Sequence, residues 1–259
     1  MGFDLNGARV LVTGASGGLG EAIARELSGR GAQLVLSGRR ADALRALSRD
    51  VSGSVVVADL SVRADIERLA AEAGELDVLI ANAGLPARGA LTGADLETIE
   101  RVTYVNLTAP IMLARLVVPG MVQRGRGQLV FISSMAGKVP RAGSALYSSN
   151  KAGLRGFAAG LRQDLHGTGV GVSTVFPGFI RDAGMFAEHV ATLPRGVGTS
   201  SPEDVARAVV DAVLKDRGEV DVAPIPVRAA GVLGGVAPDV LALLNRRTGA
   251  NRIADKRKS

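Results

Sequence analysis

The sequence predicts an α/β protein with a doubly wound, mostly parallel sheet of seven strands and helices on both faces. Three observations support this fold class. Short apolar runs rich in valine recur along the 259 residues, helical segments separate them, and each run is almost continuously hydrophobic. Strands that alternate with crossover helices form parallel sheets, and strands covered on both faces show no polar alternation.

The expected strands follow one another along the chain, each closed by glycine, proline or a polar residue. They are RVLVTG (9–14), QLVLSG (33–38), SVVVAD (54–59), DVLIANAG (77–84), QLVFISS (128–134), GVSTVFPG (171–178) and EVDVAP (219–224). The first helix is expected over 17–32, because Gly31 follows a basic last turn. Segments 93–125 and 144–170 supply long helical regions after the fourth and fifth strands. In such sheets, ligands bind beyond the carboxyl ends of the strands.

Composition indicates a globular protein and excludes several kinds of site. Hydrophobic residues make up 47% and charged residues 22% of the chain, which excludes wholesale disorder. The length suits one domain over 1–259, although length alone also allows two small ones. The absence of cysteine excludes disulfides and thiolate metal sites. Two histidines, His166 and His189, are too few for the usual zinc site, so no metal is expected.

The net charge of +6 is concentrated at the carboxyl end. From Arg246 onward, six basic residues accompany one acid, and aromatic residues make up only 3% of the chain. A basic tail with few stacking side chains does not make a nucleic-acid groove, so no nucleic-acid partner is expected. The amino-terminal segment has no secretory pattern, and no apolar run approaches the roughly 20 residues of a membrane span. A cytoplasmic protein is expected.

The first expected strand leads into TGASGGLG, where Gly14, Gly18 and Gly20 have the spacing G-x-x-x-G-x-G. Glycines there would let the backbone turn tightly and approach a pyrophosphate at the amino terminus of the next helix. The segment lacks the Gly-Lys-Ser/Thr ending of a nucleoside triphosphate loop. A glycine-rich turn without a ligand is the alternative.

The segment ALYSSNKAGL places Tyr147 four residues before Lys151. The chain has two tyrosines and five lysines, so a chance pair at this spacing would be rare. On a helix the two residues would share a face. Most other basic positions are arginine, which indicates that position 151 needs the compact charge of an ammonium. A surface pair on a helix is the alternative.

Six motifs occur in one order: TGASGGLG, NAG at 82–84, YVN ending at Asn106, ISS ending at Ser134, YSSNK at 147–151, and PG at 177–178. Together they closely resemble the short-chain dehydrogenase/reductase family over about residues 6–223. The resemblance implies a Rossmann fold and an oxidoreductase that transfers hydride between a nicotinamide and a carbonyl or secondary alcohol.

The resemblance also implies roles for individual residues. Tyr147 would be the general acid or base, and Lys151 would lower the phenol's pKa from its usual value of about 10 and bind the nicotinamide ribose. Ser134, rather than its neighbour Ser133, would hydrogen-bond the substrate oxygen. Asn106 would hold a water that links Lys151 to solvent.

The resemblance points to NADP(H) as the cofactor. Positions 37 and 38, where an acid would select NAD, are Ser and Gly, and Arg39 follows with a guanidinium suited to a 2′-phosphate. Arg40 is expected to begin a solvated helix. The expected cofactor contacts are Gly14, Ser16, Gly18, Leu19, Gly20, Arg39, Asp59, Leu60, Asn82, Gly84, Tyr147, Lys151, Pro177, Gly178 and Ile180.

Two segments depart from the family pattern. Asp182 stands where many relatives have a threonine that contacts the nicotinamide amide. The carboxyl end lacks the Val-Asp-Gly-Gly signature that pairs subunits in many relatives, so a homodimer through the long helices is expected in place of a tetramer. The extension over about 224–259 is expected to pack on the lid or on a second subunit. Contact with a membrane interface is the less favoured alternative.

A mobile substrate lid is expected over about 178–200. Its apolar lining would come from Phe179, Ile180, Met185, Phe186 and Leu193. This lining favours a lipophilic ketone, acyl thioester or sterol-like alcohol, although the same residues could instead pack the lid on the core. The alternatives to a carbonyl reductase are a 3-oxoacyl thioester reductase of fatty-acid type and a redox sensor that binds NADP without turnover.

Overall fold

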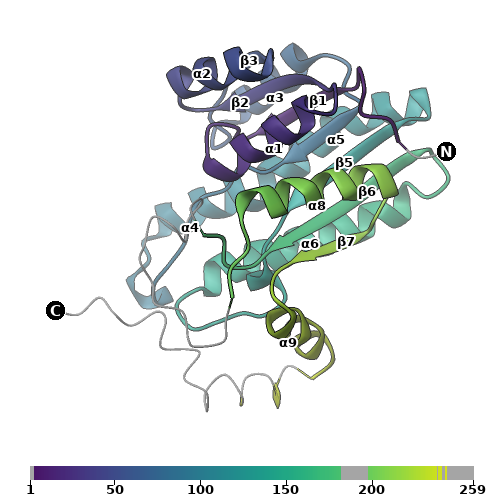
Figure 1. The fold of residues 1–259 in the computed structure, drawn as a ribbon. Coiled ribbons are helices and arrows are strands. Elements are labelled where there is room, and N and C mark those ends of the chain that lie inside the picture. Colours follow the sequence, from purple (N-terminus) through teal and green to yellow (C-terminus); the bar gives the residue numbers. More distant parts are fainter. Residues whose placement is uncertain (1–2, 182–197, 238, 241–242, 244–259) are drawn as a thin grey trace.

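The computed structural model describes residues 3–181, 198–237, 239–240 and 243, and it confirms the predicted fold class. Within these residues, seven strands form one all-parallel sheet in the order β3-β2-β1-β4-β5-β6-β7 (Figure 1). The strands are β1 (Arg9–Thr13), β2 (Gln33–Gly38), β3 (Ser54–Val57), β4 (Val78–Ala81), β5 (Gly127–Ile132), β6 (Val170–Pro177) and β7 (Glu219–Val222). The strand order reverses between β1 and β4, which is where ligands bind in such sheets.

Helices cover both faces of the sheet, as the apolar strands predict. One face packs against α1 (Gly18–Ser28), α2 (Ala41–Val51) and α8 (Pro202–Lys215), and the other packs against α3 (Arg63–Ala73), α5 (Ala109–Arg124) and α6 (Ala145–Asp164). Figure 1 shows α1 and α8 side by side in front of the sheet. Successive side chains of β1 alternate between the two cores, with Val10 and Val12 in one and Leu11 in the other.

The long helical region expected over 93–125 is present, but it is not uniform. A short 3-10 turn η1 (Leu91–Gly93) precedes α4 (Leu96–Thr103), and a π-helical turn η2 (Tyr104–Thr108) joins α4 to α5. Such turns are rare and occur often at functional sites; here the turn contains Asn106, which is 1% exposed.

By length and composition, the continuous run from Leu96 to Arg124 would be able to cross a membrane. Its residues Leu113 and Met121 are fully buried in the core beside the sheet. This part of the run therefore belongs to a helix that packs in the protein core.

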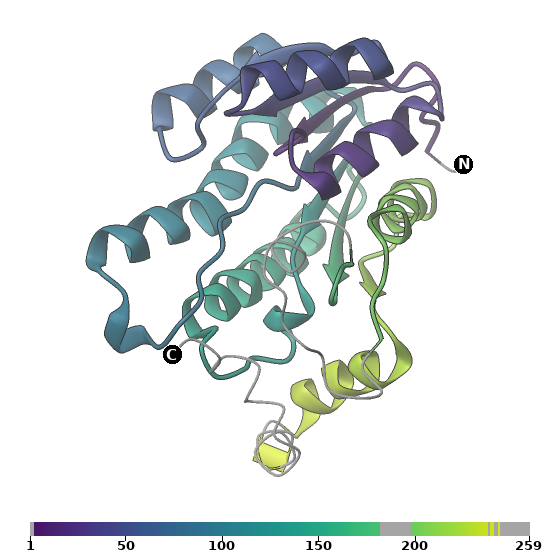
Figure 2. The same ribbon diagram turned by 60° about the vertical axis from the view of Figure 1, so that its left-hand side comes forward.

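The helix α9 (Ile225–Val236) follows β7 at the carboxyl end of the sheet and lies apart from the first three strands (Figure 2). Its Val227 packs with Met135 of the 3-10 turn η3 (Met135–Gly137), with Val139 and with Phe176 of β6. The first apolar segment of the extension thus packs against η3 and β6 of the same chain, and its predicted contact with the lid or a second subunit stays a prediction. The rest of the extension, and the expected lid over 182–197, lie largely outside the described residues.

Candidate active site

The glycine-rich loop after β1 has the geometry of an anion cradle. Gly14 has a φ of +64°, and a Cβ there would lie 2.9 Å from the Ala83 Cα, while a Cβ on Gly20 would meet the Gly14 carbonyl oxygen. The helix α1 starts at Gly18, and its N-cap residue Gly17 provides no side-chain hydrogen bond. The first amide groups of α1 are therefore available to a phosphate, which fits the pyrophosphate site predicted from these glycines.

The glycine-rich loop is tied to the end of β4. The Asn82 Nδ2 donates a hydrogen bond to the Thr13 carbonyl oxygen at 2.9 Å. In return, the Thr13 Oγ1 accepts from the backbone amides of Asn82 at 3.0 Å and Ala83 at 3.1 Å. Asn82 was predicted as a cofactor contact, and in this structure it holds the loop in place. Thr13 was missed, although a hydroxyl in an otherwise apolar strand was a usable signal.

Positions 37 to 40, at the end of β2 and just after it, differ in whether they lie against the glycine-rich loop. Ser37 is 1% exposed and points into the protein, whereas a Cβ on Gly38 would lie 3.1 Å from the Ser16 Oγ. A side chain at 38 would therefore point toward the loop. Arg40 is the exposed N-cap residue of α2, as predicted, and its guanidinium also donates to the Ser16 carbonyl oxygen. The Arg40 side chain is thus exposed to solvent and also contacts the glycine-rich loop.

Asp59, at the end of the β3 segment, is held by its own turn. Its Oδ1 accepts from the Ser61 amide at 2.9 Å and from the Ser61 hydroxyl at 2.8 Å. Burial opposes ionisation, but these bonds and the charge of Arg39 lower the pKa of Asp59. Arg39 and Asp59 thus lie close enough to interact. Leu60 packs its side chain in the core, which leaves only its backbone for a cofactor.

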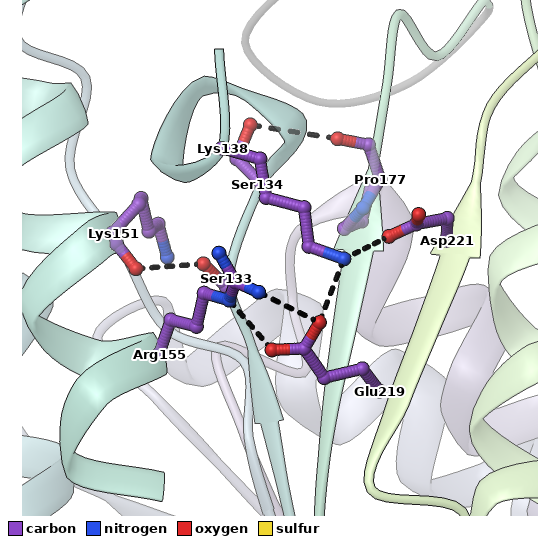
Figure 3. A network of polar contacts seen from close by, with 8 residues as sticks. All are labelled: Ser133, Ser134, Lys138, Lys151, Arg155, Pro177, Glu219 and Asp221. Atoms are coloured by element: carbon purple, nitrogen blue, oxygen red, sulfur yellow. Dashed lines mark hydrogen bonds and ion pairs between the residues drawn. The ribbon is translucent and has the colours of Figure 1, made fainter. Parts of the chain in front are cut away.

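Ser134 and Tyr147 come together between β5 and α6. Ser134 caps η3 by accepting from the Ala136 amide at 3.1 Å. Its hydroxyl donates to the Pro177 carbonyl oxygen at 3.4 Å (Figure 3). A side-chain hydrogen bond from Ser134 also acts on the Tyr147 phenol and lowers its pKa. Ser133 instead donates to the Lys151 carbonyl oxygen at 2.9 Å and is 3% exposed. The hydroxyl of Ser133 is therefore committed to the backbone, and Ser134 is the one beside the phenol.

The electrostatics of Tyr147 differ from the prediction. Burial raises the pKa of Tyr147 to about 12, against the lowering effects of the Ser134 hydrogen bond and the charge of Arg88. The Lys151 Nζ lies 5.8 Å from the centroid of the Tyr147 ring and donates to the Ile132 carbonyl oxygen at 2.7 Å. Burial lowers the pKa of Lys151 to about 8. In this structure, Arg88 is therefore the cation that lowers the phenol's pKa, not Lys151. Desolvation disfavours the charge of Lys151 itself.

Asn106 lies beside the same lysine but is occupied by the backbone. Its Oδ1 accepts from the Leu85 amide at 2.6 Å, and its Nδ2 donates to the Leu85 carbonyl oxygen at 2.9 Å. A Cβ on Gly84 would lie 3.4 Å from the Asn106 Oδ1 and 3.7 Å from the Lys151 Nζ. Gly84 thus lies in contact distance of both side chains. The predicted water between Asn106 and Lys151 stays a prediction.

The segment after β6 begins at the edge of the site. The Gly178 amide donates to the Val222 carbonyl oxygen at 2.9 Å, which aligns Pro177 and Gly178 with β7. Ile180 is 4% exposed and packs in the core, so its side chain does not line an open pocket. The remaining residues predicted here, Asp182, Met185, Phe186 and Leu193, lie outside the described part of the chain.

The order of these groups along the chain matches a known family. The family model of short chain dehydrogenases matches residues 8–194. The chain belongs to the short-chain dehydrogenase family. Its members provide the comparisons that follow.

The most similar relatives include a ketoacyl reductase, HetN, of Nostoc, which is 38% identical over 232 residues covering 86% of this chain and 81% of the relative. An NADP-dependent 3-hydroxy acid dehydrogenase, YdfG, of Escherichia coli K12 is 36% identical over 77% of this chain and 86% of its own. Among solved structures, a serine dehydrogenase complexed with NADP+ superposes with a TM-score of 0.76 at 32% identity, covering 84% of this chain and 95% of that one.

Proposed function

We propose that this protein is an NADP-dependent oxidoreductase that interconverts a carbonyl group and a secondary alcohol, with Tyr147 as the general acid or base. The observation that carries the proposal is the hydrogen bond between Tyr147 and Ser134, with Lys151 buried behind the phenol. A substrate oxygen that accepts from both hydroxyls would be polarised by them. The family and its dehydrogenase and reductase relatives support the same reaction class.

Each residue has a separate task in the reduction. The bound cofactor supplies the hydride. The Tyr147 phenol gives its proton to the carbonyl oxygen as negative charge develops there, and Ser134 holds that oxygen. A high pKa keeps the phenol protonated until this moment. The charge of Arg88 stabilises the resulting phenolate, and Lys151, held by the Ile132 carbonyl, orients the nicotinamide ribose.

The choice of NADP rests on the end of β2. A carboxylate at position 38 would point at the glycine-rich loop, but this chain has glycine there, followed by two arginines. Arg39 carries the positive charge suited to a 2′-phosphate. Relatives whose names or structures include NADP support this assignment.

The substrate is proposed to have an apolar portion, because the segment predicted to form the lid contains Phe179, Met185, Phe186 and Leu193. A 3-oxoacyl thioester reductase is the second candidate, favoured by the ketoacyl reductase among the relatives. A homodimer through α5 and α6 and a cytoplasmic location remain predictions.

Turnover separates an enzyme from a redox sensor. NADPH oxidation should be followed over a panel of ketones, 3-oxo acids, 3-oxo esters and 3-oxoacyl thioesters. We expect multiple turnovers with at least one class. NADPH binding without oxidation across the panel would favour the sensor.

A further inference from the structure

Two loops beside Tyr147 each contribute an arginine. Arg88 lies on the loop after β4, and its charge acts on the Tyr147 phenol. Arg141 lies on the loop between η3 and α6, six residues before Tyr147. The two loops are joined by a hydrogen bond from the Gly89 amide to the Gly143 carbonyl oxygen at 2.9 Å. The catalytic tyrosine therefore lies beside two linked loops that each carry a cation.

The guanidinium of Arg141 is placed by an aromatic ring. It lies over the Phe179 ring, with the Arg141 Cζ 4.4 Å from the ring centroid. Phe179 is two residues beyond Pro177, whose carbonyl oxygen lies 3.4 Å from the Ser134 Oγ. The stack thus bridges the two segments that flank Ser134. A planar guanidinium on a ring face keeps its edge free for hydrogen bonds.

The charge of Arg141 has no counterion among the residues that the structure describes. The side chain is partly buried, and desolvation alone lowers the pKa of Arg141. Lys138, three residues earlier on the same loop, provides the contrast. Its side chain is 8% exposed, and its ammonium lies 2.9 Å from a Glu219 oxygen and 2.6 Å from an Asp221 oxygen (Figure 3). Within the described part of the chain, one cation of this loop is neutralised by carboxylates and the other is not.

The surrounding sequence provides no acid for Arg141 either. Residues 82–94 and 133–144, which form the two loops, contain neither aspartate nor glutamate. A desolvated cation without a partner costs free energy, and an anion that arrives with the substrate would recover part of it. The site therefore favours a negatively charged substrate, and a neutral ketone would gain nothing from the charge of Arg141.

We infer that Arg141 binds a carboxylate of the substrate, so that the preferred substrates are oxo acids and the corresponding hydroxy acids. The inference rests on the proposed function, because it places the reacting carbonyl between Ser134 and Tyr147. A carboxylate matches the two-pronged edge of a guanidinium. The anion would then lie on the Phe179 side of the reacting carbonyl.

Matched substrate pairs test this specificity. Each pair consists of a 3-oxo acid and its methyl ester, with equal carbon chains, and NADPH oxidation gives kcat and KM for both. We expect the wild type to prefer the acid by roughly tenfold or more in kcat/KM, as a charge-assisted pair predicts. Arg141→Leu should reduce kcat/KM for the acid at least tenfold more than for the ester, chiefly through KM. Arg141→Lys should retain an intermediate preference.

Arg217→Leu is the matched control, because Arg217 is exposed before β7, at the opposite end of the sheet from the site. This control variant should have the same ratio of kcat/KM for the acid to kcat/KM for the ester as the wild type. Equal use of acid and ester by the wild type, or an unchanged ratio in Arg141→Leu, would overturn the carboxylate proposal and leave the oxidoreductase proposal standing. A preference for 3-oxoacyl coenzyme A over the free acid would also overturn it. No turnover of any pair by protein that binds NADPH would overturn both.

Discussion

The Lys151 ammonium donates a hydrogen bond to the Ile132 carbonyl oxygen at 2.7 Å, which ties α6 to the end of β5. Lys151 is only 3% exposed, and burial lowers its pKa from 10.5 to about 8. The protein thus holds a cation where water is scarce, a cost that is common at functional sites.

This buried lysine predicts an unusual dependence of stability on pH. Because the folded pKa lies below the unfolded one, the unfolded chain binds more protons between about pH 8 and 10.5, so stability rises with pH in this window. Relative to Lys151→Met, the wild type should gain about 2 kcal/mol between pH 7.5 and 10. Urea unfolding of both proteins at each pH measures the difference. Parallel pH profiles would show that Lys151 is not desolvated in this way.

Tyr147→Phe should remove the proton donor and little else. Turnover is expected to fall by at least about 100-fold, the lower range of general acid catalysis, while NADPH affinity stays within about twofold. Tyr104→Phe is the matched control, since Tyr104 is the chain's other tyrosine and its hydroxyl donates to the Met112 sulfur at 3.5 Å. Retention of a tenth of the activity by the Tyr147 variant would assign the proton transfer to another group.

Arg39 should select the cofactor. The wild type is expected to bind NADPH more than about tenfold more tightly than NADH, and Arg39→Asp should abolish or reverse this preference. Fluorescence titration with each cofactor gives the four dissociation constants. Arg45→Asp, on the exposed side of α2, controls for the change in net charge. If the Arg39 variant has the same ratio of NADPH to NADH dissociation constants as the wild type, this residue does not select the cofactor.

The helix α9 should support the segment that contains Ser134. A Cβ on Gly231 would lie 2.8 Å from the Met135 Cε, whereas a Cβ on Gly235 would meet nothing within 4 Å. Gly231→Leu is therefore expected to lower stability by about 1 to 3 kcal/mol through overpacking. It should also raise the substrate's KM, because Met135 follows Ser134. Gly235→Leu is the control on the same helix, and equal effects of the two changes on thermal unfolding and KM would contradict the contact.

Local patterns explain why much of the fold could be predicted. The seven valine-rich runs became the seven strands, and the glycines after β1 became a tight loop with a left-handed Gly14. Hydrophobic period and glycine chemistry act over a few residues, so they can be read without knowledge of distant contacts. The approach of Ser134 to Tyr147 was accessible through the resemblance, which supplied a spacing that already reflects the fold.

The features that the sequence did not predict are contacts between segments far apart in the chain. The Arg40 guanidinium contacts the Ser16 carbonyl oxygen of the glycine-rich loop, the Ile180 side chain packs in the core, and the charge of Arg88 acts on Tyr147. None of these follows from the residues on either side.

The sequence by itself determined the α/β class, the order of its elements and the residue types available for proton transfer and dinucleotide binding. Only the tertiary structure decided the electrostatic state of those residues: that Lys151 is held by Ile132, that the phenol's pKa is raised, and that Arg141 is stacked on Phe179 without a described counterion. The physical reason is that a pKa or an ion pair depends on which groups folding brings within a few ångströms and on how much water it removes. Both quantities are properties of the packed chain, not of its local pattern.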